Sequence, residues 1–170
     1  FDMVIRAFAQ LPRGAAELHL VGDGPERKSL ERLAEESGVG DSAHFYGYHA
    51  DPFPILKSAS IGVLPSEFEP FGNVIIEMFA VGLPVVAFDV DYGPREIIRD
   101  GENGFLVKTR TPEGLARALG MLLEDASLRS QMGAKARGDA EQHYALSQAV
   151  RNYEACFTLL RNHGQMATTA

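Results

Sequence analysis

The chain has 170 residues, of which 45% are hydrophobic and 23% charged, and a formal net charge of −7 at pH 7. This composition fits one soluble globular domain, and the acidic balance argues against nucleic acid as a general partner, because binding to phosphate backbones needs a basic field. The single cysteine, Cys156, excludes an internal disulfide and favours a reducing compartment. No apolar run approaches the ~20 residues of a membrane-spanning helix.

Apolar periodicity interrupted by Gly and Pro predicts short strands that alternate with helices. In chain order we expect a helix over 2–11, a strand over 17–21, a helix over 25–37, a strand over 44–46, a short helix over 51–57, a strand over 61–64, a helix from about 73, a strand over 85–88, a short helix over 94–99 and a strand over 105–107. From 111 onward we expect helices only, the last over 146–161. Such alternation predicts an α/β fold with a parallel sheet and right-handed crossovers.

Four loops follow predicted strands and therefore share one rim of the sheet. Ligands of open α/β sheets bind beyond the carboxyl ends of the strands. The loops are 22–24, 47–48, 65–73 and 89–94. We expect the functional site on this rim.

Two carboxylates dominate the third of these loops and the helix after it. Glu69 lies in the loop, and Glu77 lies about one turn into the helix that starts near Asn73. Side chains tilt toward a helix N-terminus, and the free N–H groups there attract anions. Glu77 lies in an otherwise apolar helix, so a functional role is favoured over a solvated surface position. Together these features predict a ligand with both hydroxyls and phosphates.

The other motifs are weaker. Gly22 and Gly24 fit a tight turn before a helix as well as close approach of a ligand, since a dinucleotide fingerprint needs a third glycine. His19 is predicted to be a core histidine, and Cys156 to lie in the core. Arg95 is expected to cap its helix. No cluster of His, Cys and Asp has metal-ligand spacing, so we expect no metal and no cofactor.

Nearly the whole chain resembles the C-terminal, donor-binding domain of GT-B glycosyltransferases of the family 4 (group 1) type. The resemblance is carried by Glu69-x7-Glu77 and by the segments 21–26, 45–48, 72–74, 80–87, 93–98 and 100–107. It implies a Rossmann-like parallel sheet flanked by helices, the C-terminal half of a GT-B fold without its first strand. We expect this domain over 1–163, with C-terminal helices over 111–162 and a mobile tail over 164–170.

The resemblance also implies a function, that of a retaining, metal-independent transferase whose donor is a nucleotide-diphosphate sugar. Glu69 would be the catalytic-site residue that contacts hydroxyls of the donor sugar, and Glu77 would hold the ribose hydroxyls. Backbone N–H groups of 71–73 would approach the sugar and phosphates, and the peptide groups of 44–48 would line the base. The expected donor-binding set is Glu77, Phe71, Gly72, Asn73, Val74, Gly22, Gly24, Tyr46, Gly47 and Tyr48.

Members of this family carry, just upstream of the helix over 2–11, a strand and a loop whose Arg and Lys grip the diphosphate. We therefore expect the chain to be part of a longer protein and to be inactive alone. We expect that longer protein to be cytoplasmic, and to work at the inner face of the membrane if it associates with the membrane peripherally. Its expected partners are the nucleotide sugar and an N-terminal acceptor domain, which the last helix would face; the oligomeric state stays open. Two alternatives stay open: a non-enzymatic nucleotide-sugar-binding module and a GT-B-like nucleotide-sugar epimerase.

Overall fold

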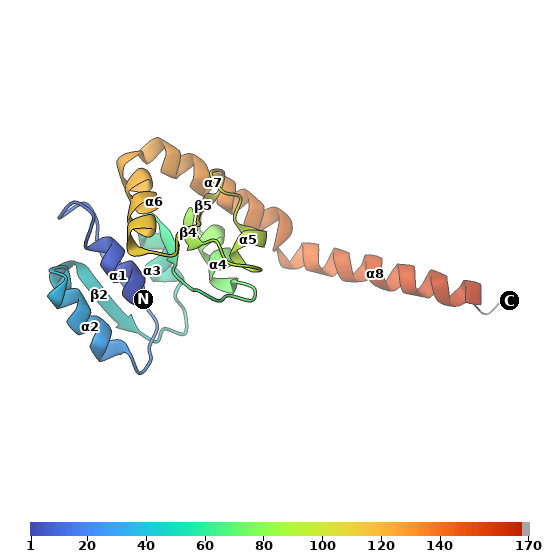
Figure 1. Ribbon diagram of the computed structural model, residues 1–170. Helices are drawn as coiled ribbons and strands as arrows, with labels where there is room; N and C mark the ends of the chain where they lie inside the picture. Colours follow the sequence, from blue (N-terminus) through green and yellow to red (C-terminus); the bar gives the residue numbers. More distant parts are fainter. Residues whose placement is uncertain (168–170) are drawn as a thin grey trace.

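The computed structural model describes residues 1–167, with side chains described up to residue 161. Its elements alternate as predicted (Figure 1). In chain order they are α1 (Asp2–Phe8), β1 (Leu18–Val21), α2 (Arg27–Glu36), the 3-10 helix η1 (Gly40–Ser42), β2 (Ala43–Gly47), α3 (Phe53–Ser58), β3 (Gly62–Leu64), α4 (Asn73–Ala80), β4 (Val85–Phe88), α5 (Pro94–Ile97), β5 (Gly104–Val107), α6 (Pro112–Glu124), α7 (Ala126–His143) and α8 (Leu146–Ala167).

The strands pair in parallel, which confirms the predicted class, but they form two sheets. β1 pairs with β2, with Leu18 opposite Ala43. The second sheet has the order β3-β4-β5, with Val86 opposite Val63 and Phe105. Among the described residues β1 pairs with β2 alone, so its other edge is free.

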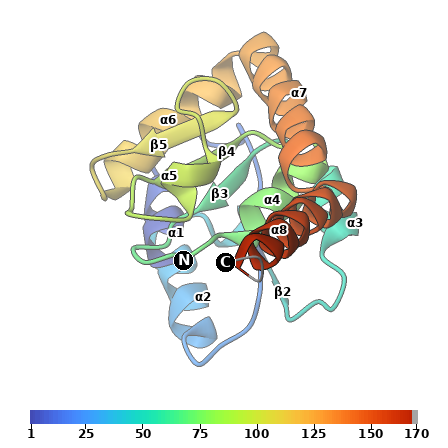
Figure 2. The same ribbon diagram turned by 90° about the vertical axis from the view of Figure 1, so that its right-hand side faces the viewer.

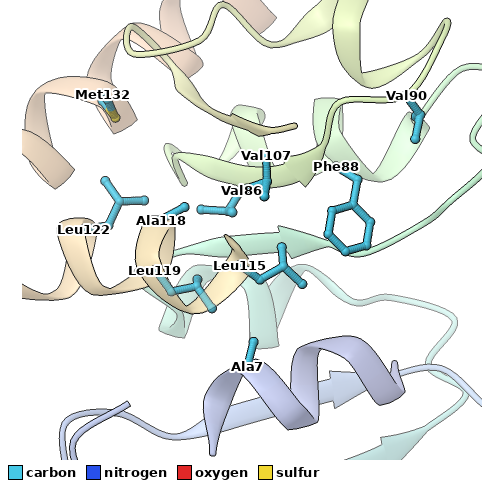
Figure 3. Close-up of a cluster of buried hydrophobic side chains, with 10 residues drawn as sticks. All are labelled: Ala7, Val86, Phe88, Val90, Val107, Leu115, Ala118, Leu119, Leu122 and Met132. Atoms are coloured by element: carbon cyan, nitrogen blue, oxygen red, sulfur yellow. The ribbon is translucent and has the colours of Figure 1, made fainter. Parts of the chain in front are cut away.

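β4 is the centre of the molecule, because all four of its residues are buried. A strand covered on both faces reads as a continuous apolar run rather than an alternating one. Val86 and Phe88 pack against α6 and α7, in a cluster with Leu115 and Leu122 (Figure 3). Val85 and Ala87 belong to the second cluster, on the side of α4, which lies beside α7 (Figure 2).

A third cluster holds the β1–β2 sheet to α1 and α2. Val4 of α1, Leu20 of β1 and Ala34 of α2 are buried together. Val63 of β3 packs against this cluster and also against the first one. The two sheets are therefore joined by side-chain packing, with Val63 at the junction.

The C-terminal helix differs from its prediction. α8 continues to Ala167 and leaves the body of the molecule (Figure 1). Cys156, predicted to be in the core, is exposed, because no other described element covers this helix. Residues 164–167 of the predicted tail are helical and 168–170 lie outside the described residues, so the mobility of the tail stays a prediction. Within the described residues no helix is long and apolar enough to cross a membrane.

One helix start also differs from its prediction. Pro25 was expected at the first position of a helix, but α2 begins at Arg27. Pro25 instead lies in a turn, which the Arg27 N–H closes by donating to the Gly24 carbonyl at 3.2 Å. The proline therefore shapes the entry to α2 without belonging to it.

Candidate functional site

The ends of β1 and β2 meet at two glycines of the predicted site. The Gly22 N–H donates to the Gly47 carbonyl at 2.9 Å, with φ of 138° at Gly22 and 73° at Gly47. A side chain at Gly47 would also press on Arg27, since a Cβ built there lies 2.9 Å from Nη1. Both positions therefore need glycine. This contact brings the first two rim loops together, as the sequence predicted.

The third rim loop ends in a helix N-terminus with free donors. Gly72 precedes α4 in the left-handed conformation, with φ 91° and ψ 48°. The first bond into the helix runs from the Ile75 N–H to the Gly72 carbonyl at 2.9 Å. The N–H groups of the preceding residues, including Asn73 and Val74, therefore have no partner within α4. Such groups favour the binding of an anion.

The two predicted carboxylates flank this N-terminus. Glu69 and Glu77 are both half-buried. Glu69 lies against Gly72, because a Cβ built on that glycine would be 3.5 Å from Glu69 Cγ. Among the described residues neither carboxylate has a hydrogen-bond or ion-pair partner. A half-buried carboxylate without a protein partner is available to a ligand with hydroxyl groups.

Large aromatic side chains are exposed on the same rim. They are Tyr46, Tyr48, Phe68, Phe71 and Tyr92. Exposed apolar groups gathered around polar ones mark binding sites more often than bare surface. Phe68 and Tyr92 were not predicted as site residues, although both lie in the rim loops that the sequence identified.

His19 is not a core residue, contrary to its prediction. Its side chain is 29% exposed, and Nδ1 lies 2.9 Å from the Tyr46 hydroxyl. Glu17 Oε2 lies 3.6 Å from Nε2 of both His19 and His44. Successive strand residues point to opposite faces, so His19 faces away from the buried Leu20. It thereby helps to fix the ring of Tyr46.

A cleft of about 630 Å³ lies beside the rim, between α1 and α2. Gly22 and Gly24 line it together with Leu20 and Phe45, whereas Glu69 and Glu77 do not. The structure thus places the predicted residues in two groups. One group lies at the ends of β1 and β2, where Gly22 and Gly24 border the cleft, and the other lies around the start of α4.

Residues 1–139 match the family described as glycosyl transferases group 1. The chain belongs to this family. It is 42% identical over 132 residues to the lipopolysaccharide core biosynthesis glycosyltransferase LpsE of Rhizobium meliloti, covering 78% of this chain and 38% of that protein. It is 32% identical over 155 residues to N-acetyl-alpha-D-glucosaminyl L-malate synthase of Bacillus anthracis, covering 91% of this chain and 40% of that protein. The chain thus spans about two fifths of the length of these relatives.

Solved glycosyltransferases of the GT-B class share the fold. The structure of HepE from Anabaena in complex with UDP matches with a TM-score of 0.83 and 28% identity, over 94% of this chain and 44% of that one. WaaG, a glycosyltransferase involved in lipopolysaccharide biosynthesis, matches with a TM-score of 0.75 and 31% identity, over 83% of this chain and 39% of that one. These matches confirm the predicted fold class and family.

Proposed function

We propose that this chain of the glycosyl transferases group 1 family is the donor-binding domain of a retaining hexosyltransferase. Its donor is a nucleotide-diphosphate sugar, and the reaction needs no metal ion. The observation that carries the proposal is the pair of half-buried carboxylates Glu69 and Glu77, which have no partners among the described residues, with free N–H groups at the start of α4. A neighbour with this fold, HepE, is known in complex with UDP.

The proposed roles are those that the resemblance to the family implies, and the chemistry of each group agrees with them. Glu69 accepts hydrogen bonds from hydroxyls of the donor sugar, and Glu77 accepts them from the ribose. The N-terminus of α4 stabilises the negative charge that develops on the leaving diphosphate as the bond to the sugar breaks. In this scheme the leaving phosphate takes the acid–base role, so Glu69 need not act as a nucleophile.

Two further proposals concern the chain as a unit. The first is that a longer protein supplies the acceptor site and the Arg and Lys that grip the diphosphate, so that this chain alone has no transferase activity. The second is that the enzyme works in the cytoplasm. Charge-assisted bonds to phosphate are the stronger ones, so a version extended upstream is expected to bind the donor more tightly than the chain does.

Calorimetric titration with UDP-, GDP- and ADP-sugars tests the donor site. One of these donors is expected to bind, and Glu77→Ala is expected to weaken it by about 10-fold or more, the equivalent of a hydrogen bond to a charged group. Glu124→Ala is the matched control, because Glu124 is an exposed glutamate on α6, away from the rim. If no nucleotide bound to the chain or to its extended version, the proposal would fail.

Turnover assays of the extended protein separate the alternatives. A non-enzymatic nucleotide-sugar-binding module would bind the donor but transfer no sugar in the extended protein. An epimerase would convert the sugar nucleotide without an acceptor, which product analysis by NMR detects. Transfer to an acceptor with the donor's anomeric configuration kept is the outcome expected of a retaining transferase.

A further inference from the structure

The loop after β4 presses directly on the loop that carries Glu69. Gly93 is buried and has φ 43° and ψ −99°. A Cβ built on Gly93 would lie 2.5 Å from the Glu69 carbonyl oxygen and 2.9 Å from that of Phe71. Both contacts are to backbone, which cannot rotate away as a flexible side chain can. The two loops can therefore pack this closely only while residue 93 has no side chain.

The loop that contains Gly93 is itself fixed from the other side. The Asp89 N–H donates to the Val107 carbonyl of β5 at 3.0 Å. The Arg95 guanidinium pairs with Asp89 at 2.8 Å and with Asp91 at 2.7 Å, closing the loop around Gly93. These bonds hold the loop in place, so that it can fix the position of the Glu69 segment that packs against it.

The backbone next to Gly93 is also strained. Among the described residues Tyr92 is the only residue other than glycine with a positive φ, at 68°. Residues held in the left-handed region cost of order 1 kcal/mol or more and persist where surrounding structure imposes them. The 92–93 segment is thus held in one shape by its neighbours.

We propose that Gly93 is a positioning residue for the sugar side of the donor site. Glu69 has no side-chain partner among the described residues, so the position of its backbone limits which positions its carboxylate can reach. Gly93 contacts that backbone at both Glu69 and Phe71. The inference rests on the proposed function, because it assumes that Glu69 contacts the donor sugar.

Gly93→Ala tests the proposal, with Gly101→Ala as the control. Gly101 also has a positive φ, at 81°, but no atom lies within 4 Å of a Cβ built there. The control therefore carries backbone strain without the collision. Dissociation constants are measured in the full chain for the nucleotide sugar found by the titration and for its free nucleoside diphosphate.

Losing a hydrogen bond to a charged group costs roughly 10- to 100-fold in affinity. We therefore expect Gly93→Ala to weaken nucleotide-sugar binding by about 10- to 100-fold and the nucleoside diphosphate by less, because the diphosphate loses only what the Phe71 backbone contributes beside the phosphates. Gly101→Ala is expected to leave both constants within about twofold. In a Glu69→Gln background, Gly93→Ala is expected to add little, because residues that act through one another are not additive.

Three outcomes would overturn the inference while leaving the donor site intact: unchanged sugar binding in Gly93→Ala, equal losses for both ligands, or additivity with Glu69→Gln. If Gly93→Ala does not fold, Arg95→Ala replaces it. Arg95 is 51% exposed, so its removal frees the loop without crowding it. The same selective loss, smaller in size, is then expected, and unchanged binding would contradict the proposal. Absence of any nucleotide binding to the unaltered protein would instead overturn the proposed function, and this inference with it.

Discussion

Glu69 and Glu77 lie beside the same helix N-terminus, but the proposed roles give their substitutions different effects. Glu69 is proposed to contact the sugar and Glu77 the ribose. The sugar is absent from a free nucleoside diphosphate, whereas the ribose is present in both ligands. The two carboxylates can therefore be told apart by comparing the two ligands.

Glu69→Gln is expected to weaken binding of the nucleotide sugar by about 10-fold or more and to leave the nucleoside diphosphate unchanged, whereas Glu77→Gln is expected to weaken both. Calorimetry on each variant with both ligands makes the measurement. Equal effects of Glu69→Gln on the two ligands would show that Glu69 does not contact the sugar. Circular dichroism of each variant serves as the control for folding.

Among single residues, the sequence identified those whose positions depend on nearby residues in the chain. The Glu69-x7-Glu77 spacing and the glycines at 22, 47 and 72 were predicted because loop and helix positions follow from local patterns. Gly93 was recognised only as part of a family motif, since its contact with the Glu69 loop is tertiary. His19 was misassigned because alternation along one strand does not reveal which face stays uncovered.

Among the elements, the turn after α5 is fastened to α7 by a buried polar network. The fully buried Asn103 donates from Nδ2 to Asp139 Oδ2 at 2.9 Å and accepts from the Arg99 N–H at 2.8 Å. The Arg99 guanidinium also donates to Asp139. Burial acts to raise the pKa of Asp139, but the hydrogen bonds from Asn103 and Arg99 outweigh it, so the pKa lies below its ordinary value.

Asp139→Asn is expected to lower the free energy of unfolding by about 1–2 kcal/mol, because Asn103 and Arg99 lose a charged acceptor; the 44% exposure of Arg99 keeps the effect modest. The lowered pKa fixes the sign of the pH dependence. The stabilisation is complete above the unfolded-state pKa of about 4 and is lost as the pH falls through the lower folded-state value.

Urea unfolding of the protein and of Asp139→Asn at several pH values measures this difference. Glu141→Gln on the same helix is the matched control, because its ion pair with Arg137 is exposed and is expected to contribute little. If the difference in unfolding free energy between the protein and Asp139→Asn stayed constant down to the lowest pH, the lowered pKa of Asp139 would be contradicted.

Element types were predicted well because strand and helix periods are local properties. The observed ends of the elements differ from the predicted ends where side chains from other segments determine them. α1 ends at Phe8 rather than near residue 11, and β2 and β5 are longer than predicted. Local sequence patterns could not predict the division into two sheets, because strand pairing depends on segments that are distant along the chain.

For the molecule as a whole, the core and the last helix differ in what they contribute to stability. Leu122 of α6 is fully buried in the cluster that contains Val86 of β4 and Met132 of α7, whereas Phe157 on α8 is 65% exposed. We expect Leu122→Ala to cost about 2–5 kcal/mol and Phe157→Lys to stay within about 0.5 kcal/mol. Thermal unfolding of both variants of this chain makes the comparison. A large loss in Phe157→Lys would mean that α8 is covered in solution.

The division of the strands into two sheets has a consequence for local opening. Among the described residues β1 and β2 form strand pairing only with each other, and packing around Val63 joins this unit to the rest. Proteins open in cooperative units of unequal stability. We expect the amide hydrogen of Leu20 to exchange with solvent faster than that of Val86, by a factor that NMR measures residue by residue. Equal protection of the two would contradict the division.

The proposed donor site draws residues from both units, Tyr46 and Gly47 from one and Glu69 and Glu77 from the other. A nucleotide that binds across them would fasten the weaker unit to the stronger one. Saturation with nucleotide sugar is therefore expected to slow exchange in β1 and β2 far more than in β4. The ligand would then supply the attachment that backbone hydrogen bonds do not make between the two sheets.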